Sequence, residues 1–151
     1  MKTIVYTDGA ASPNPGAGGW ATLIHNELHS GGMPYTTNNE MEAYAILTAA
    51  ALAKPNERIH IITDSKLCIG WYQRGWKCKN PITEGYIKRY REIVRESNLT
   101  VTFQWVKGHS NDEGNDIVDR AAVRASGWIA NRDDIIARRA FYADGVFGTA
   151  I

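Results

Sequence analysis

The alternation of hydrophobic and polar positions along the chain predicts a sheet covered by helices. Short runs rich in β-branched residues are typical of strands, and longer runs rich in Ala, Leu and Met are typical of helices. The predicted strands are residues 2–7, 20–24, 33–37, 59–63 and 100–106. The predicted helices are residues 38–53, 65–72, 81–97 and 112–126, and Gly127 is a suitable residue to end the last one. This order indicates an α/β fold with a mixed sheet.

Two other segments have a different character. Residues 8–19 are dense in Gly, Pro and Asn, which predicts a turn region. Within it, residues 16–21 formally match a dinucleotide-binding glycine motif, but they lead into a predicted strand where that motif must open a helix. No repeat or linker divides residues 1–126, which we expect to form one domain, and residues 127–151 are expected to form a C-terminal tail of unassigned role.

Length and composition favour a globular protein of the cytoplasm. The 151 residues are 44% hydrophobic and 22% charged, which is enough for one core. The longest nearly apolar stretch, residues 43–53, is shorter than the about 18 residues of a membrane span, and Asp8 interrupts the first residues where a signal peptide would need apolar ones. Cys68 and Cys78 are too few for a disulfide framework or a zinc cluster, which indicates a reducing compartment.

The charges are unevenly distributed along the chain. The formal net charge is only +1, but residues 74–91, here called the basic stripe, have Glu84 as their one acid among the cations Arg74, Lys77, Lys79, Lys88, Arg89 and Arg91. Such a run is usually a solvated helix face. The aromatic residues in and beside the stripe are Trp71, Tyr72, Trp76, Tyr86 and Tyr90. Because rings beside cations suit sugars, bases and phosphates, nucleic-acid binding is an equally good interpretation.

Two carboxylates follow predicted strands in Thr-Asp pairs. Taken singly, Asp8 with Gly9 is a turn pair, and Asp64 with Ser65 is a helix cap. If the two strands are parallel neighbours, however, both carboxylates lie at the edge where α/β sheets bind ligands. Clustered carboxylates repel one another unless a cation lies between them, and such oxygen ligands suit magnesium or manganese better than zinc. A pair of such ions is the apparatus for in-line displacement at phosphorus.

The predicted helices carry further acids, and for these the spacing leaves alternatives open. Glu40 and Glu42 are separated by about 200° around a helix, so they cannot both face one site, and Glu40 is expected at the surface. On the last predicted helix Asp112, Asp116 and Asp119 compete, and spacing alone does not choose between them.

Six short motifs follow one another in order along residues 2–126. They are Thr7-Asp8-Gly9-Ala10, Asn14-Pro15-Gly16-Ala17-Gly18-Gly19, Thr36-Thr37-Asn38-Asn39-Glu40-Met41-Glu42, Thr63-Asp64-Ser65, Arg74-Gly75-Trp76-Lys77 and Trp105-Val106-Lys107-Gly108-His109-Ser110. Together they resemble type 1 ribonuclease H, the bacterial form most closely. The resemblance implies a ribonuclease H-like five-stranded mixed sheet, with three antiparallel strands first and helices on both faces. It also implies endonucleolytic cutting of the RNA strand of an RNA–DNA hybrid, which leaves 5′-phosphate and 3′-hydroxyl ends.

The same resemblance assigns the catalytic residues. Its four metal-binding carboxylates fall on Asp8, Glu42, Asp64 and Asp119, and the last is chosen by its distance from the Gly-His motif. They would hold two Mg²⁺ ions, for which Mn²⁺ can substitute, one activating water and the other stabilising the leaving 3′ oxygen. His109 alone would be interpreted as an ordinary loop imidazole, but the motif makes it a mobile proton carrier that is not a metal ligand.

The resemblance also assigns contacts to an RNA–DNA hybrid, bound by a monomer. Contacts to the minor groove on the RNA side fall on Gly9, Asn38 and Asn39. A contact to a DNA phosphate falls on Asn14 and Thr37, and contacts to DNA sugars and phosphates fall on Trp76 and Lys77. For Asn14, a role as the turn residue before Pro15 is compatible with this.

The chain departs from the family pattern in one respect. Bacterial relatives typically carry a basic helical protrusion between the third carboxylate and the Arg-Gly-Trp-Lys motif, and the interval from Asp64 to Trp76 is too short for it. We expect the basic stripe to substitute in part, with weaker hybrid binding of steeper salt dependence. Glu40 places a negative charge near the minor-groove contacts, and Lys66 either contacts a phosphate or is solvated.

Two other classes of function remain as alternatives. A transposase, integrase or junction resolvase of similar fold usually has additional DNA-binding domains, for which 151 residues leave no room. A non-catalytic hybrid-binding module would lack one of the four carboxylates, and all four are present.

Overall fold

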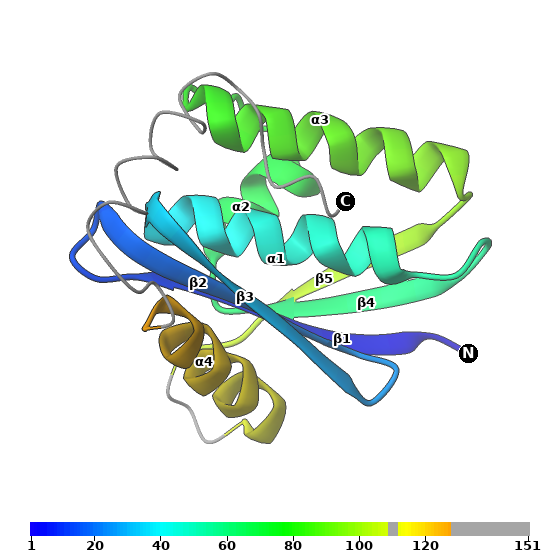
Figure 1. Ribbon diagram of the computed structural model, residues 1–151. Helices are drawn as coiled ribbons and strands as arrows, with labels where there is room; N and C mark the ends of the chain where they lie inside the picture. Colours follow the sequence, from blue (N-terminus) through cyan, green and yellow to red (C-terminus); the bar gives the residue numbers. More distant parts are fainter. Residues whose placement is uncertain (109–111, 128–151) are drawn as a thin grey trace.

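The computed structural model describes residues 1–108 and 112–127, and it confirms the five-stranded mixed sheet with helices on both faces (Figure 1). The strands are β1 (Thr3–Ala11), β2 (Gly16–Ile24), β3 (Glu27–Thr36), β4 (Arg58–Thr63) and β5 (Thr100–Trp105). The helices are α1 (Asn38–Leu52), α2 (Lys66–Tyr72), α3 (Pro81–Glu96) and α4 (Glu113–Ser126). The strand order is β3-β2-β1-β4-β5, in which β1 to β3 are antiparallel and β4 is parallel to both β1 and β5.

The helices form a layer on each side of the sheet. Helix α1 packs on β1 and β2, and α3 packs on α1, whereas α4 covers β1, β2 and β3 from the opposite face (Figure 1). The larger core lies on the α1 side, and its fully buried side chains include Val5, Met41, Ile46, Ile59 and Ile61. The smaller core under α4 consists of Ala21, Val118, Ala121 and Ala122. No helix in the described part of the chain is long and apolar enough to cross a membrane.

The first two strands extend into the segment that was predicted as a turn. Only residues 12–15 separate β1 from β2, so the prediction of a turn over residues 8–19 was wrong for most of its length. The reason is close packing: a Cβ atom at Gly19 would meet the backbone of Ala122 and Ser126 on α4. Glycine in a strand often marks such a close approach. Because residues 16–21 lie within β2, they do not form a dinucleotide-binding loop.

The start of β3 and the end of α4 also differ from expectation. Strand β3 begins at Glu27, well before residue 33, because His25 and Asn26 form a tight hairpin with φ values of 53° and 59°. Positive φ at both central residues is the geometry of a type I′ turn. Gly127 follows α4 with φ of −78°, so it is not the left-handed terminating residue that glycine usually provides.

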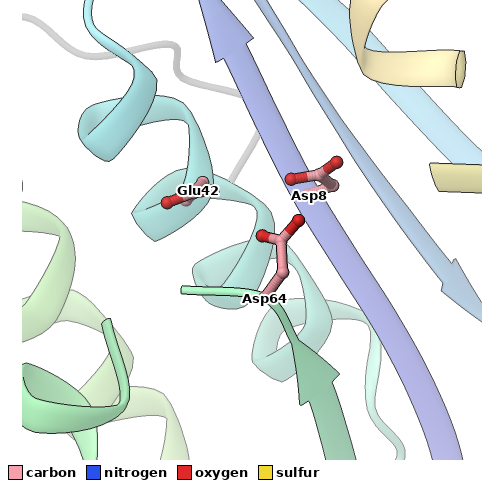
Figure 2. A group of neighbouring side chains, drawn as sticks. All are labelled: Asp8, Glu42 and Asp64. Carbon is pink, nitrogen blue, oxygen red and sulfur yellow. The ribbon is translucent and has the colours of Figure 1, made fainter. Parts of the chain in front are cut away.

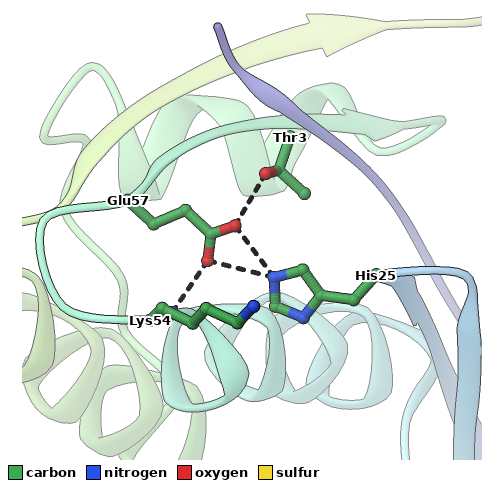
Figure 3. A network of polar contacts seen from close by, with 4 residues as sticks. All are labelled: Thr3, His25, Lys54 and Glu57. Carbon is green, nitrogen blue, oxygen red and sulfur yellow. Dashed lines mark hydrogen bonds and ion pairs between the residues drawn. The ribbon is translucent and has the colours of Figure 1, made fainter.

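A polar network joins three segments at the start of β1 (Figure 3). The Glu57 carboxylate accepts hydrogen bonds from Thr3 Oγ1 at 2.6 Å, Lys54 N at 2.7 Å and His25 Nε2 at 2.8 Å. Burial acts to raise the pKa of Glu57, but the hydrogen bonds from Thr3, Lys54 and His25 outweigh it and hold the pKa below its ordinary value. The ionised carboxylate is therefore the form that stabilises this end of the sheet.

We expect Glu57→Gln to lower the unfolding free energy at pH 7 by about 1 kcal/mol, which is about 2–4 °C in Tm. Because the pKa of Glu57 is lowered in the folded state, this stabilisation is present above the carboxyl's unfolded pKa and is lost as the pH falls through its folded pKa. Thermal unfolding at pH 7 and pH 3.5 measures the loss, with the exposed Glu96→Gln as control. An equal effect of Glu57→Gln at both pH values would contradict the role of the charge.

Candidate functional site

Three carboxylates from separate elements converge at the end of the β1–β4 pair (Figure 2). Asp8 lies within β1, Glu42 on α1 and Asp64 directly after β4. One oxygen atom of each lies within 4.8 Å of the other two. The condition for bringing Asp8 and Asp64 together is met, because β1 and β4 are adjacent and parallel. Asp8 does not follow the end of its strand, as the Thr-Asp pattern suggested, since β1 continues to Ala11.

Close packing of β1 against α1 brings Glu42 into this group. A Cβ atom at Gly9 would meet the backbone of Met41 and Glu42, so glycine allows the strand and the helix to approach. The Gly9 amide also donates to Asp8 Oδ1 at 2.9 Å, which orients that carboxylate.

Burial and mutual repulsion set the electrostatics of the group. Burial, and then the charges of Asp64 and Glu42, raise the pKa of Asp8 to about 9, against a lowering contribution from the Gly9 amide. Burial and Asp64 likewise raise the pKa of Glu42 to about 8, although a hydrogen bond with Ser65 opposes the rise. The group therefore cannot hold all its charges at neutral pH without a cation. Its donor atoms are carboxylate oxygens, which fit Mg²⁺ or Mn²⁺.

The fourth predicted carboxylate reaches the group from the other face of the sheet. The Asp119 side chain on α4 lies close enough to Asp8 to help raise the pKa of that carboxyl. Its competitor Asp112 is instead the N-cap of α4, where its side chain accepts from the Asn115 amide at 3.1 Å. These contacts favour Asp119 over Asp112, a choice that the spacing in the sequence left open.

A matched pair of variants tests that choice. For the hybrid-cleaving activity that the sequence resemblance implies, we expect Asp119→Asn to reduce the rate by about tenfold, because Asp119 acts on Asp8 but lies outside the tightest group of carboxylates. Asp116→Asn, the same chemical change in the first turn of the same helix, is expected to cleave at the wild-type rate. Initial rates under single-turnover conditions measure both. A larger loss for Asp116→Asn would reverse the assignment.

Asp64 is held in place by the strand beside it. Trp105 Nε1 donates to the Asp64 carbonyl at 3.0 Å, and the Lys66 ammonium lies 4.2 Å from the centre of the Trp105 ring. The Trp105 side chain is 42% exposed. The sequence did not indicate that Trp105 bonds the Asp64 carbonyl, since alternation of apolar residues does not distinguish a ring in the core from a ring that contacts a neighbouring loop.

Gly108, the residue before His109 in the chain, lies next to Asp64. A Cβ atom at Gly108 would lie 3.1 Å from Asp64 Oδ2, so this glycine touches the carboxylate group. His109 itself lies outside the described residues, as does the tail beyond Gly127.

Most of the predicted substrate contacts gather at the start of α1. Asn38 Oδ1 accepts from the Ala11 amide, and the Asn38 amide donates to Asn14 Oδ1 at 3.1 Å. Thr37 caps α1 by accepting from the Glu40 amide at 3.1 Å, and Asn39 is exposed beside it. Together with Gly9, these residues adjoin Glu42, which lies one turn further along the helix.

Trp76 and Lys77 lie apart from them, in the loop between α2 and α3. One face of the Trp76 ring packs on α2, since a Cβ atom at Gly70 would lie within the ring. The ring is 48% exposed, and the Arg74 guanidinium lies 5.9 Å from its centre. The ring and the Lys77 ammonium are therefore available to a ligand.

The expectation that Glu40 lies at the surface was wrong, and most of the aromatic residues near the basic stripe are buried. Glu40 is 5% exposed and not at the surface, because its carboxylate accepts from Thr36 Oγ1 at 2.9 Å and Asn80 Nδ2 at 3.0 Å. Asn80 is in turn the N-cap of α3, so Glu40 links the starts of α1 and α3. Of the aromatic residues in and beside the basic stripe, only Trp76 is exposed; the buried ones are Trp71, Tyr72, Tyr86 and Tyr90.

The comparisons with known proteins agree on one family. The family model described as RNase H matches residues 1–127. A ribonuclease H of Maricaulis maris is 40% identical over 139 residues, which is 81% of this chain and 92% of the relative. A ribonuclease HI of Rickettsia prowazekii is 37% identical over 140 residues, which is 82% and 90% of the two chains. A solved structure, LC11-RNase H1 in complex with an RNA/DNA hybrid, has a TM-score of 0.70 at 24% identity and covers 83% of this chain and 97% of that one.

Proposed function

The chain belongs to the ribonuclease H family, which implies endonucleolytic cleavage of RNA in RNA–DNA hybrids, and we propose that it performs this cleavage by two-metal-ion catalysis. The observation that carries the proposal is the convergence of Asp8, Glu42 and Asp64 within 4.8 Å. Mg²⁺ is the proposed metal, with Mn²⁺ as a substitute, and the products are a 5′-phosphate and a 3′-hydroxyl.

Each carboxylate has a distinct place in this proposal. Asp8, oriented by the Gly9 amide, is assigned to both ions. Asp64 and Asp119 complete the set for one ion, and Glu42 completes the set for the other. When bound, the two ions would supply an activated water and would stabilise the charge on the leaving 3′ oxygen.

His109 is proposed as the group that carries a proton during attack or product departure. Its support is the position of Gly108, the preceding residue, against Asp64. An imidazole titrates near neutral pH and suits this task without binding metal.

The substrate is proposed to lie across the start of α1 and the loop before α3. Gly9, Asn38 and Asn39 would read the 2′-hydroxyls of the RNA strand in the shallow minor groove. Asn14 and Thr37 would bind a phosphate of the DNA strand, and Trp76 with Lys77 would contact its sugars and phosphates. The exposed Trp76 ring and the bonded arrangement of Asn14 with Asn38 support these assignments.

Several broader assignments accompany this function. We propose a monomer in the cytoplasm, with residues 1–126 as the catalytic domain and residues 127–151 as a tail of unassigned role. A non-catalytic hybrid-binding module is the alternative from another class, and the complete set of carboxylates disfavours it.

The test is incubation of the purified protein with labelled RNA–DNA hybrid, double-stranded DNA and double-stranded RNA, each with Mg²⁺ and with a chelator. Cutting of the RNA strand of the hybrid alone, and only with Mg²⁺, is expected. Binding without cutting would support the module, and cutting of double-stranded DNA would support a resolvase.

A further inference from the structure

A basic groove lies between the α2–α3 loop and one face of α3. It encloses about 450 Å³, and its lining includes Trp76 and Lys77 from the loop and Lys88 and Arg91 from α3. Glu84 is the one acid in the lining, so three cations face the groove against a single carboxylate. A hollow with this excess of positive charge suits an anionic ligand.

The α3 residues that line the groove share one helix face, and one of them is held by a hydrogen bond. Its lining residues on α3 are Glu84, Ile87, Lys88 and Arg91, whose spacing of three and four places them on one helix face. The Arg91 Nη2 atom donates to the Trp71 carbonyl at 3.4 Å, which tethers the guanidinium.

Only some cations of the basic stripe line the groove. Arg89 does not line the groove, and its Nη1 atom contacts Glu92 Oε2 at 3.1 Å. Lys88 and Arg91, in contrast, are exposed and directed into the same hollow as Lys77. A solvated helix face therefore describes Arg89 well but does not account for the groove.

The groove also lies close to the carboxylate group. Helix α2 begins at Lys66, two residues after Asp64. The Trp76 ring covers Gly70, which lies about 6 Å along the helix axis from Lys66. A duplex bound at the carboxylates carries phosphates on both strands within that reach.

We infer that Lys88 and Arg91 bind phosphates of the DNA strand of the hybrid. The inference rests on the proposed function, because it takes the strand from the assignment of Trp76 and Lys77, which form the opposite wall of the groove. The α3 cations thereby extend the path of that strand beyond the α2–α3 loop.

The test compares two variants that remove equal charge. Lys88→Ala with Arg91→Ala empties the groove wall, whereas Arg58→Ala with Arg89→Ala removes two exposed cations elsewhere. With Asp8→Asn as a background that leaves the hybrid intact, fluorescence anisotropy measures hybrid affinity from about 50 to about 300 mM salt. We expect about tenfold weaker binding for the groove variant, and a slope of log affinity against log salt that is smaller by about 2. Equal slopes for the two variants would overturn the inference.

Neutral methylphosphonate linkages identify the strand. Placed in the DNA strand, they are expected to abolish the difference between the groove variant and its parent; a difference abolished only by linkages in the RNA strand would overturn the assignment. Cleavage by the groove variant without the Asp8→Asn change should show a raised KM and an unchanged kcat. The proposed function is judged separately, by whether wild-type protein cuts the hybrid with Mg²⁺.

Discussion

Replacing Asp8 by Asn is expected to reduce Mg²⁺-dependent cleavage of an RNA–DNA hybrid by about 10³-fold or more. Asp8 is electrostatically coupled to all three other carboxylates, since Asp64, Glu42 and Asp119 each act to raise its pKa. The substitution keeps the shape of the side chain but removes the negative charge shared by both proposed ions, which destroys the electrostatic stabilisation of the transition state.

The Asp8→Asn result is informative only if the fold survives. Circular dichroism and thermal unfolding should show a folded variant, and Asp116→Asn provides the same substitution outside the carboxylate group. Single-turnover rates at a saturating concentration of Mg²⁺ measure the loss. A folded Asp8→Asn protein that cleaves at the wild-type rate would refute the catalytic assignment.

The same substitution is expected to stabilise the metal-free protein, by about 2 kcal/mol at pH 8. A chain of this size would then gain about 4–8 °C in Tm. The buried Asp8 carboxyl has a pKa raised to about 9 in the folded protein, far above its unfolded value. Between those two values the folded state binds more protons than the unfolded state, so stability falls as the pH rises. Asparagine carries no titrating proton and avoids this loss.

Thermal unfolding in a chelator at pH 5 and pH 8 measures this effect. The advantage of Asp8→Asn should be larger at pH 8, and added Mg²⁺ should raise the Tm of the wild-type protein more than that of the variant. If Asp8→Asn were less stable than wild type in chelator at pH 8, burial and repulsion of the carboxylates would not be what limits the stability of the metal-free protein.

Much of the fold could be predicted from local pattern. Pro81 at the start of α3, the Ala- and Leu-rich run of α1 and the apolar β4 each follow from propensity and periodicity. The pairing of β1 with β2 at Gly19 could not be predicted in this way, because glycine's advantage there comes from its contact with α4, a helix about a hundred residues later.

In the candidate site, too, some residues could be predicted from the local sequence, whereas others depend on distant contacts. Asp8 and Asp64 could be proposed from strand ends and sheet topology, whereas Asp119 needed either the resemblance or the contact with Asp8. The buried position of Glu40 depends on Asn80, a partner forty residues away, and no local pattern indicates it. Burial of the aromatic rings near the basic stripe likewise follows from the packing of α3 on α1 and not from their neighbours in the chain.

The small core beneath α4 affects which part of the protein unfolds locally first. Three of the four buried residues of that smaller core are alanines, and only the partly buried Tyr6, Ala10 and Leu23 pack against them, so less apolar surface holds α4 to the sheet than holds α1. Local opening should therefore begin at α4, and it would withdraw Asp119 while Asp8, Glu42 and Asp64 stay assembled. Loss of the fourth acid and global unfolding are in this way separate events, and catalytic competence can fade at temperatures where the main body of the protein is still intact.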